Sequence, residues 1–132
     1  MVFSIMISCN EKKTEFIQSK VTSNLFLIKN IPTDDSLLKN DIINFLIKNP
    51  TEYEKRPFHI NFYRYTSKTK YFLDNVPDYS GGFVDENLTL YEKDQIASFI
   101  VSKCENDSSR VVGEFQFYDN FFKTDTIIYN CN

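Results

Sequence analysis

The chain has 132 residues and a net charge of −3; 42% of its residues are hydrophobic and 16% are aromatic. A chain of this length forms a single domain and is long enough to bury a hydrophobic core. Its basic residues form no group larger than Lys12-Lys13 or Lys55-Arg56, so we expect no nucleic-acid partner, which would need a concentrated basic face. No apolar run approaches the length of about 18 residues that spans a bilayer.

The segment around Cys9 carries the most specific signal in the sequence. Residues 1–8 are uncharged and almost wholly apolar, Ser8 is small, and the chain becomes polar and charged directly after the cysteine. Met6-Ile7-Ser8-Cys9 resembles the lipobox of a bacterial lipoprotein. In a lipobox the cysteine thiol is alkylated by a diacylglycerol and the peptide bond before the cysteine is cut, which requires a small preceding residue.

This resemblance implies a cellular location and a domain organisation. Residues 1–8 would be part of a signal peptide that lacks its charged n-region. Residues 9–21 would be a polar tether, ordered only where Phe16, Ile17 and Val21 reach a core. A lipid on Cys9 would anchor the protein to a membrane of the cell envelope, at the outer membrane or on the periplasmic face. The abundance of Asn, Ile, Lys and Phe, with Ala97 as the single alanine, is similar to lipoproteins of low-GC bacteria such as the Bacteroidota.

A second interpretation of the same residues remains open. Apolar runs of this length also occur as buried strands. Residues 2–8 would then be an ordinary core strand that ends in a free cysteine, and the protein would be cytoplasmic.

Hydrophobic periodicity predicts the elements of a domain over residues 22–132. A short apolar run over 24–29 predicts a buried strand that Pro32 ends. Asp34 and Asp35 then supply a helix N-cap and favourable negative charge. The helix is expected to follow and to end at Asn49-Pro50, with an apolar face at helical spacing that consists of Leu38, Ile42, Phe45 and Leu46.

After the helix the hydrophobic period changes to two. Residues 58–65 alternate, which places Ile60 and Phe62 on one face and His59 and Tyr63 on the other. A polar turn leads into residues 71–73, so we expect these two segments to form a hairpin. Further strands are predicted over 95–104, 111–118 and 126–131.

These elements predict an α+β fold. One helix in the N-terminal half packs on one face of an antiparallel sheet of about five to six strands, in the order β-α-β-β-β-β-β. The other face of such a sheet can remain in contact with water.

The long connection over residues 75–86 is the best candidate for a binding site. It contains two of the three glycines, two aromatic residues and three carboxylates. Long loops on rigid sheets tend to carry binding residues, and a pair of glycines allows close backbone approach to a partner. The candidate binding residues are Asp78, Tyr79, Gly81, Gly82 and Phe83. The alternative is a wide turn whose aromatic rings fold back onto the core.

No residue pattern predicts catalysis, a metal site or a cofactor. His59 is the only histidine, and we expect it to be a hydrogen-bonding residue in the middle of a strand. The strand face that bears Tyr63, Tyr65 and Tyr71 is a second candidate for protein binding, because tyrosine is enriched at such surfaces.

Cys104 and Cys131 lie at the ends of predicted strands and leave two interpretations. In an exported protein they would form a disulfide that closes a loop of about 27 residues. In a cytosolic protein they would be two unpaired thiols.

The sequence therefore predicts a lipid-anchored, non-catalytic module of the cell envelope that binds another protein. An immunity-type lipoprotein that blocks a secreted toxin is one form of this function, by analogy alone. One alternative is a small periplasmic hydrolase or ligand-binding domain that uses the 75–86 loop with His59. Another is a cytosolic protein of unknown role.

Overall fold

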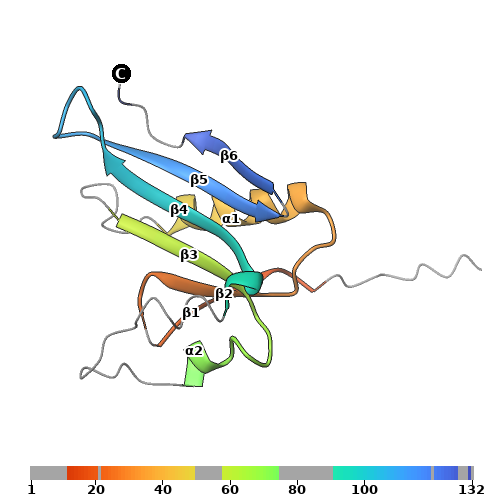
Figure 1. The fold of residues 1–132 in the computed structure, drawn as a ribbon. Coiled ribbons are helices and arrows are strands. Elements are labelled where there is room, and N and C mark those ends of the chain that lie inside the picture. Colours follow the sequence, from red (N-terminus) through yellow and green to blue (C-terminus); the bar gives the residue numbers. More distant parts are fainter. Residues whose placement is uncertain are drawn as a thin grey trace, which may run out of the picture.

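The computed structural model describes residues 12–20, 22–49, 58–74, 91–119, 121–127 and 131. The described residues form six strands, one long helix and two short helical turns (Figure 1). In chain order these are β1 (Glu15–Gln18), β2 (Leu25–Lys29), α1 (Asp35–Lys48), β3 (Phe58–Arg64), α2 (Tyr71–Asp74), the 3₁₀ turn η2 (Glu92–Asp94), β4 (Gln95–Lys103), β5 (Val111–Asp119) and β6 (Phe121–Ile127).

The six strands form one sheet in sequence order, from β1 at one edge to β6 at the other. Strand pairing is antiparallel throughout except between β2 and β3, which run parallel. Parallel neighbours need a long crossover, and α1 provides it. The predicted α+β fold with one long helix on a sheet is confirmed. The prediction that the sheet is wholly antiparallel was wrong at this one pair, because α1 carries the chain from the end of β2 back to the end of the sheet at which β2 begins, so that β3 runs in the same direction as β2.

The predicted helix is confirmed as α1, and local side-chain chemistry explains where it begins. Asp34 is the N-cap, and its Oδ1 accepts hydrogen bonds from the backbone N–H groups of Ser36 at 2.8 Å and Leu37 at 3.3 Å. These bonds satisfy N–H groups that have no partner within the helix. The buried residues of α1 are Leu38, Ile42 and Leu46.

The main core lies between α1 and the sheet. The buried face of the helix packs against strand residues such as Phe62, Phe99 and Phe115, each of which is fully buried. Alternate residues of β3, β4 and β5 therefore point toward the helix, as the period-two pattern predicts for β3.

A second, smaller core lies on the opposite face of the sheet. It consists of Leu25, Leu27 and Tyr63, with Tyr65, Leu73 and Tyr91 packed against it at lower burial. Part of the face that was expected to be wet is therefore covered, by residues of α2 and of the turn before η2.

Two predicted strands differ from the structure. Residues 71–73 lie in the helical turn α2 rather than in a strand, because the preceding turn is closed locally by hydroxyl groups. Thr69 is fully buried, and its hydroxyl donates to the carbonyl of Arg64 at 2.7 Å and accepts from the N–H of Thr66 at 2.7 Å. Such side-chain bonds compete with strand pairing.

The last strand also lies earlier than predicted. It begins at Phe121 rather than at residue 126, because Phe121 pairs with Asp119 and β6 (Phe121–Ile127) thus follows β5 directly. Residues 128–130 of the predicted strand lie outside the described residues. A further strand, β1, lies inside the segment predicted as a tether.

Candidate functional site

Several predicted site residues lie outside the described part of the chain. These are the lipidation residue Cys9 and the loop residues Asp78, Tyr79, Gly81, Gly82 and Phe83. Their roles remain predictions.

His59 is exposed on the face of β3 that points away from α1. Its Nε2 lies 3.1 Å from the side-chain amide nitrogen of Asn24. Two residues farther along the strand, Asn61 Oδ1 accepts a hydrogen bond from the hydroxyl of Ser98 at 2.8 Å. The Nε2 of Gln95 donates to the same hydroxyl at 2.9 Å. Among the described residues, no group of three or more His, Cys, Asp or Glu side chains could hold a metal ion.

The predicted tyrosine face does not form one exposed surface. Tyr63 is 2% exposed and belongs to the second core. Burial, with smaller contributions from the neighbouring Tyr118 and Glu92, raises the pKa of Tyr63 to about 12. Tyr65 is half-buried beneath the ammonium group of Lys29, which lies 4.2 Å from the ring centroid.

Tyr71 lies on α2 and not on the sheet, and it is 43% exposed. The prediction that it shares a strand face with Tyr63 and Tyr65 was therefore wrong.

The best candidate site is a groove between the edge strand β1 and helix α1. We call it the β1–α1 groove, and its lining includes Lys13, Thr14, Phe16, Asp41, Phe45 and Lys48. The rings of Phe16 and Phe45 stack at 4.3 Å between centroids with an interplanar angle of 11°. The hydroxyl of Thr14 donates to Asp41 Oδ2 at 2.6 Å and so ties the start of β1 to the helix. The groove has a volume of about 560 Å³.

A second hollow adjoins this groove, because both are lined by Lys13, Thr14 and Asp41. The other residues of its lining are Lys12, Asn30, Ile31, Pro32, Thr33 and Leu37. Asn30 adopts a left-handed backbone conformation with φ of 54°, and its side-chain amide donates to the carbonyl of Lys13 at 3.2 Å. The chain before β1 is thus held against the end of β2.

The sequence missed this groove because residues 9–21 were interpreted as a tether. Four residues of β1 are too few to show a clear period. The only signal was the adjacent pair Phe16-Ile17 in an otherwise polar segment. One of these residues faces α1 and the other faces away, as their pairing with Ile28 and Leu27 shows.

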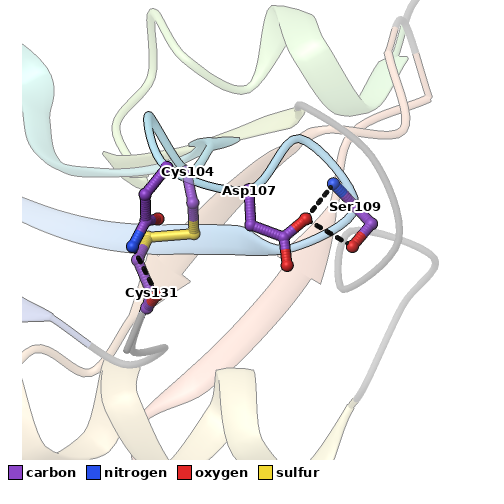
Figure 2. Close-up of a disulfide and its surroundings, with 5 residues drawn as sticks. Cys104, Asp107, Ser109 and Cys131 are labelled. Carbon is purple, nitrogen blue, oxygen red and sulfur yellow. Dashed lines mark hydrogen bonds between the residues drawn. A yellow bond between two sulfur atoms is a disulfide. The ribbon is translucent and has the colours of Figure 1, made fainter.

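The structure joins Cys104 and Cys131 by a disulfide, with 5.5 Å between their Cα atoms (Figure 2). The adjacent hairpin is held by Asp107, whose Oδ1 accepts bonds from the N–H of Ser109 at 3.0 Å and from its hydroxyl at 2.6 Å. These bonds lower the pKa of the Asp107 carboxyl. The side-chain amide of Asn106 donates to the carbonyl of Cys131 at 3.2 Å.

Comparison with known proteins gives no relative: the chain matches no protein-family model, no curated protein and no solved structure. Within the described residues, no helix has both the length and the apolar character required to cross a membrane.

Proposed function

We propose that this protein is a lipid-anchored, non-catalytic module of the cell envelope that binds another protein. The proposed location in the cell envelope rests on the lipobox-like segment that ends in Ser8-Cys9. The Cys104–Cys131 disulfide supports it, because disulfides persist in oxidising compartments such as the periplasm and the cell surface.

The observation that carries the binding role is the β1–α1 groove. It combines half-buried aromatic rings, Phe16 and Phe45, with the charged side chains of Lys13, Lys48 and Asp41. An apolar floor with a polar rim is the usual composition of a protein-binding surface. The groove also runs beside β1, which is the edge of the sheet.

A narrower form of this function is an immunity-type lipoprotein that blocks a secreted toxin. The small size and the net negative charge of the chain are similar to those of such proteins. If the protein has this immunity-type function, its partner is a secreted protein.

The anchor is tested by expressing the gene with its native upstream region. We expect the protein to enter the detergent phase on phase partitioning and to incorporate labelled fatty acid, and we expect Cys9→Ala to abolish both. A wild-type protein that stays in the aqueous phase without label would contradict the anchor.

Partner binding is tested separately, by photo-crosslinking in native envelopes and by measuring the affinity of the identified protein for purified Cys9→Ala chain. We expect one saturable partner. If crosslinking at β1, at α1 and at the exposed residues around His59 recovers no saturable partner, the binding role is wrong. An immunity-type partner would be toxic when secreted into cells that lack this protein.

A further inference from the structure

The described residues leave one edge of the sheet at β1. Strand pairing in the described residues uses one side of β1 only, toward β2. An unpaired strand edge presents a row of N–H and C=O groups that another strand can pair with.

The alternation of hydrogen-bonded and non-bonded pairs between β1 and β2 shows which backbone groups of β1 face outward. The N–H of Ser19 donates to the carbonyl of Leu25 at 2.8 Å. In an antiparallel ladder, bonded and non-bonded pairs alternate. Glu15 lies opposite Lys29, and Ile17 lies opposite Leu27. The backbone groups of Glu15 and Ile17 therefore also point toward β2.

The intervening residues, Phe16 and Gln18, belong to the non-bonded pairs. Their backbone N–H and C=O groups therefore point away from β2. An added strand would bond to these two residues. Alternate side chains of that strand would point toward α1 and lie over the aromatic floor that Phe16 and Phe45 form.

The charges around this edge are mainly positive. Lys12 and Lys13 precede β1, Lys20 follows it and Lys48 lies across the groove, and all four are exposed.

Two described carboxylates lie beside these four lysines, Asp41 and Glu15, and both line the groove. Asp41 accepts the hydroxyl of Thr14, and Glu15 lies opposite Lys29 of β2. The lysines therefore outnumber the described carboxylates at this edge. A complementary strand would carry acidic residues at its ends and apolar residues in its centre.

Self-association fits this charge pattern less well. If β1 paired antiparallel with β1 of a second copy so that Phe16 lay opposite Gln18 of that copy, Lys20 would lie diagonal to Lys12 of that copy, and this would occur twice. Like charges on neighbouring cross-strand positions are unfavourable.

We propose that the protein partner inserts an extended segment, apolar in its centre and acidic at both ends, as a seventh strand on β1 along the β1–α1 groove. This inference rests on the proposed function and specifies the mode of contact and the chemistry of the partner. The backbone of the segment bonds to Phe16 and Gln18, and its acidic ends face the lysines that flank β1.

Two blocked peptides of matched apolar content test the proposal: Glu-Glu-Val-Thr-Val-Thr-Glu-Glu and the same sequence with lysine in place of glutamate. Each is titrated into ¹⁵N-labelled full chain carrying Cys9→Ala, and amide hydrogen exchange is followed. We expect the acidic peptide to slow exchange at the amides of Phe16 and Gln18 by about tenfold or more at saturation, with little change at Glu15 and Ile17. The lysine peptide is expected to bind at least about tenfold more weakly.

Charge variants provide the matched control. Lys13→Glu with Lys48→Glu should weaken binding of the acidic peptide by about tenfold or more. Lys68→Glu with Lys103→Glu makes the same change in net charge at exposed positions away from the groove and should leave binding unchanged. Should the first pair fail to fold, Gln18→Pro removes one outward N–H, which an edge strand tolerates, and should also weaken binding.

Several results would overturn the proposal. Equal binding of both peptides, or protection at residues other than Phe16 and Gln18, would remove its basis. Protection of these two amides without peptide that is lost on dilution would make a second copy the occupant. If such protection persists at all concentrations and disappears when residues 1–8 are deleted, the occupant is the chain's own N-terminal segment.

Binding of the crosslinked partner to the charge variant tests this inference separately from the proposed function. A partner that binds the variant with Lys13→Glu and Lys48→Glu as tightly as the unchanged protein would leave the binding role standing and reject strand addition. The absence of any saturable partner would reject the binding role itself.

Discussion

Tyr63 is buried on the side of the sheet opposite α1, and its phenol is held in the neutral form. Burial raises its pKa to about 12, from an ordinary value of 10.0. The folded state thus retains a proton that the unfolded chain releases between these two pH values. The stabilisation is fully present below pH 10 and is lost as the pH rises toward 12.

We therefore expect the free energy of unfolding to fall by at most about 3 kcal/mol between pH 9 and pH 12 through this group. Urea denaturation at a series of pH values measures it. Tyr63→Phe should flatten this part of the profile, while Tyr71→Phe, at an exposed tyrosine, should not. A profile that is identical in the Tyr63→Phe protein would show that Tyr63 titrates normally.

Asn30 couples the start of β1 to the end of β2. Its φ of 54° lies in the left-handed region, which asparagine tolerates better than other non-glycine residues. Its side-chain amide also holds the carbonyl of Lys13. The residue therefore has a backbone role and a side-chain role that substitutions can separate.

We expect Asn30→Gly to lose the amide bond but keep the backbone geometry, at a cost of about 1 kcal/mol. Asn30→Ala should lose both and cost about 1 kcal/mol more. Chemical denaturation measures both changes. Equal stability of the two variants would indicate that the left-handed conformation carries no cost here.

At the scale of elements, the Cys104–Cys131 disulfide ties the end of β4 to the chain beyond β6. The two cysteines are 27 residues apart in the sequence. Closing a loop of this size stabilises the folded state by about 3–4 kcal/mol in the chain-entropy model.

Cys104→Ser with Cys131→Ser should lower the free energy of unfolding by roughly this amount under oxidising conditions. Reduction with dithiothreitol should lower the stability of the unchanged protein to the same level and leave the double variant unaffected. A reduced protein as stable as the oxidised one would assign the bridge no role in stability.

The elements that could be predicted are those whose signal is local and repeated. The helix has an N-cap at Asp34 and an apolar residue at every turn, and β3 has strict alternation. Neither signal depends on the rest of the fold. The parallel pairing of β2 with β3 was not predictable from either strand, since it depends on where the crossover helix returns the chain.

The candidate groove could not be predicted for a related reason. Its floor joins Phe16 to Phe45, which are far apart in the sequence and meet only when β1 pairs with β2 and α1 packs on the sheet. The strand that contributes Phe16 has four residues, too few for a period to distinguish it from a tether. Likewise, the burial of Tyr63 depends on Leu73 and Tyr91, from segments that are not its neighbours in sequence.

At the scale of the whole molecule, the two interpretations of residues 1–8 differ in whether these residues cover an edge of the sheet. As a cleaved signal segment, these residues contribute nothing to the mature fold, and the edge at β1 is open to a partner. As a core strand, residues 2–8 would pair with one of the two sheet edges, at β1 or β6. An anchor on Cys9 would also keep Phe16 within about 25 Å of the membrane, the greatest reach of seven residues.

Deleting residues 1–8 from the chain decides between these interpretations. We expect the deletion to change the free energy of unfolding by less than about 0.5 kcal/mol, as for residues outside a folded core. A buried strand with five large apolar side chains would instead cost several kcal/mol, at about 1.5–3 kcal/mol for each side chain returned to water. Urea denaturation of the shortened protein and of the full Cys9→Ala chain measures the difference. A loss of several kcal/mol would place residues 2–8 in the core, remove the signal-segment interpretation and close one edge of the sheet to a partner.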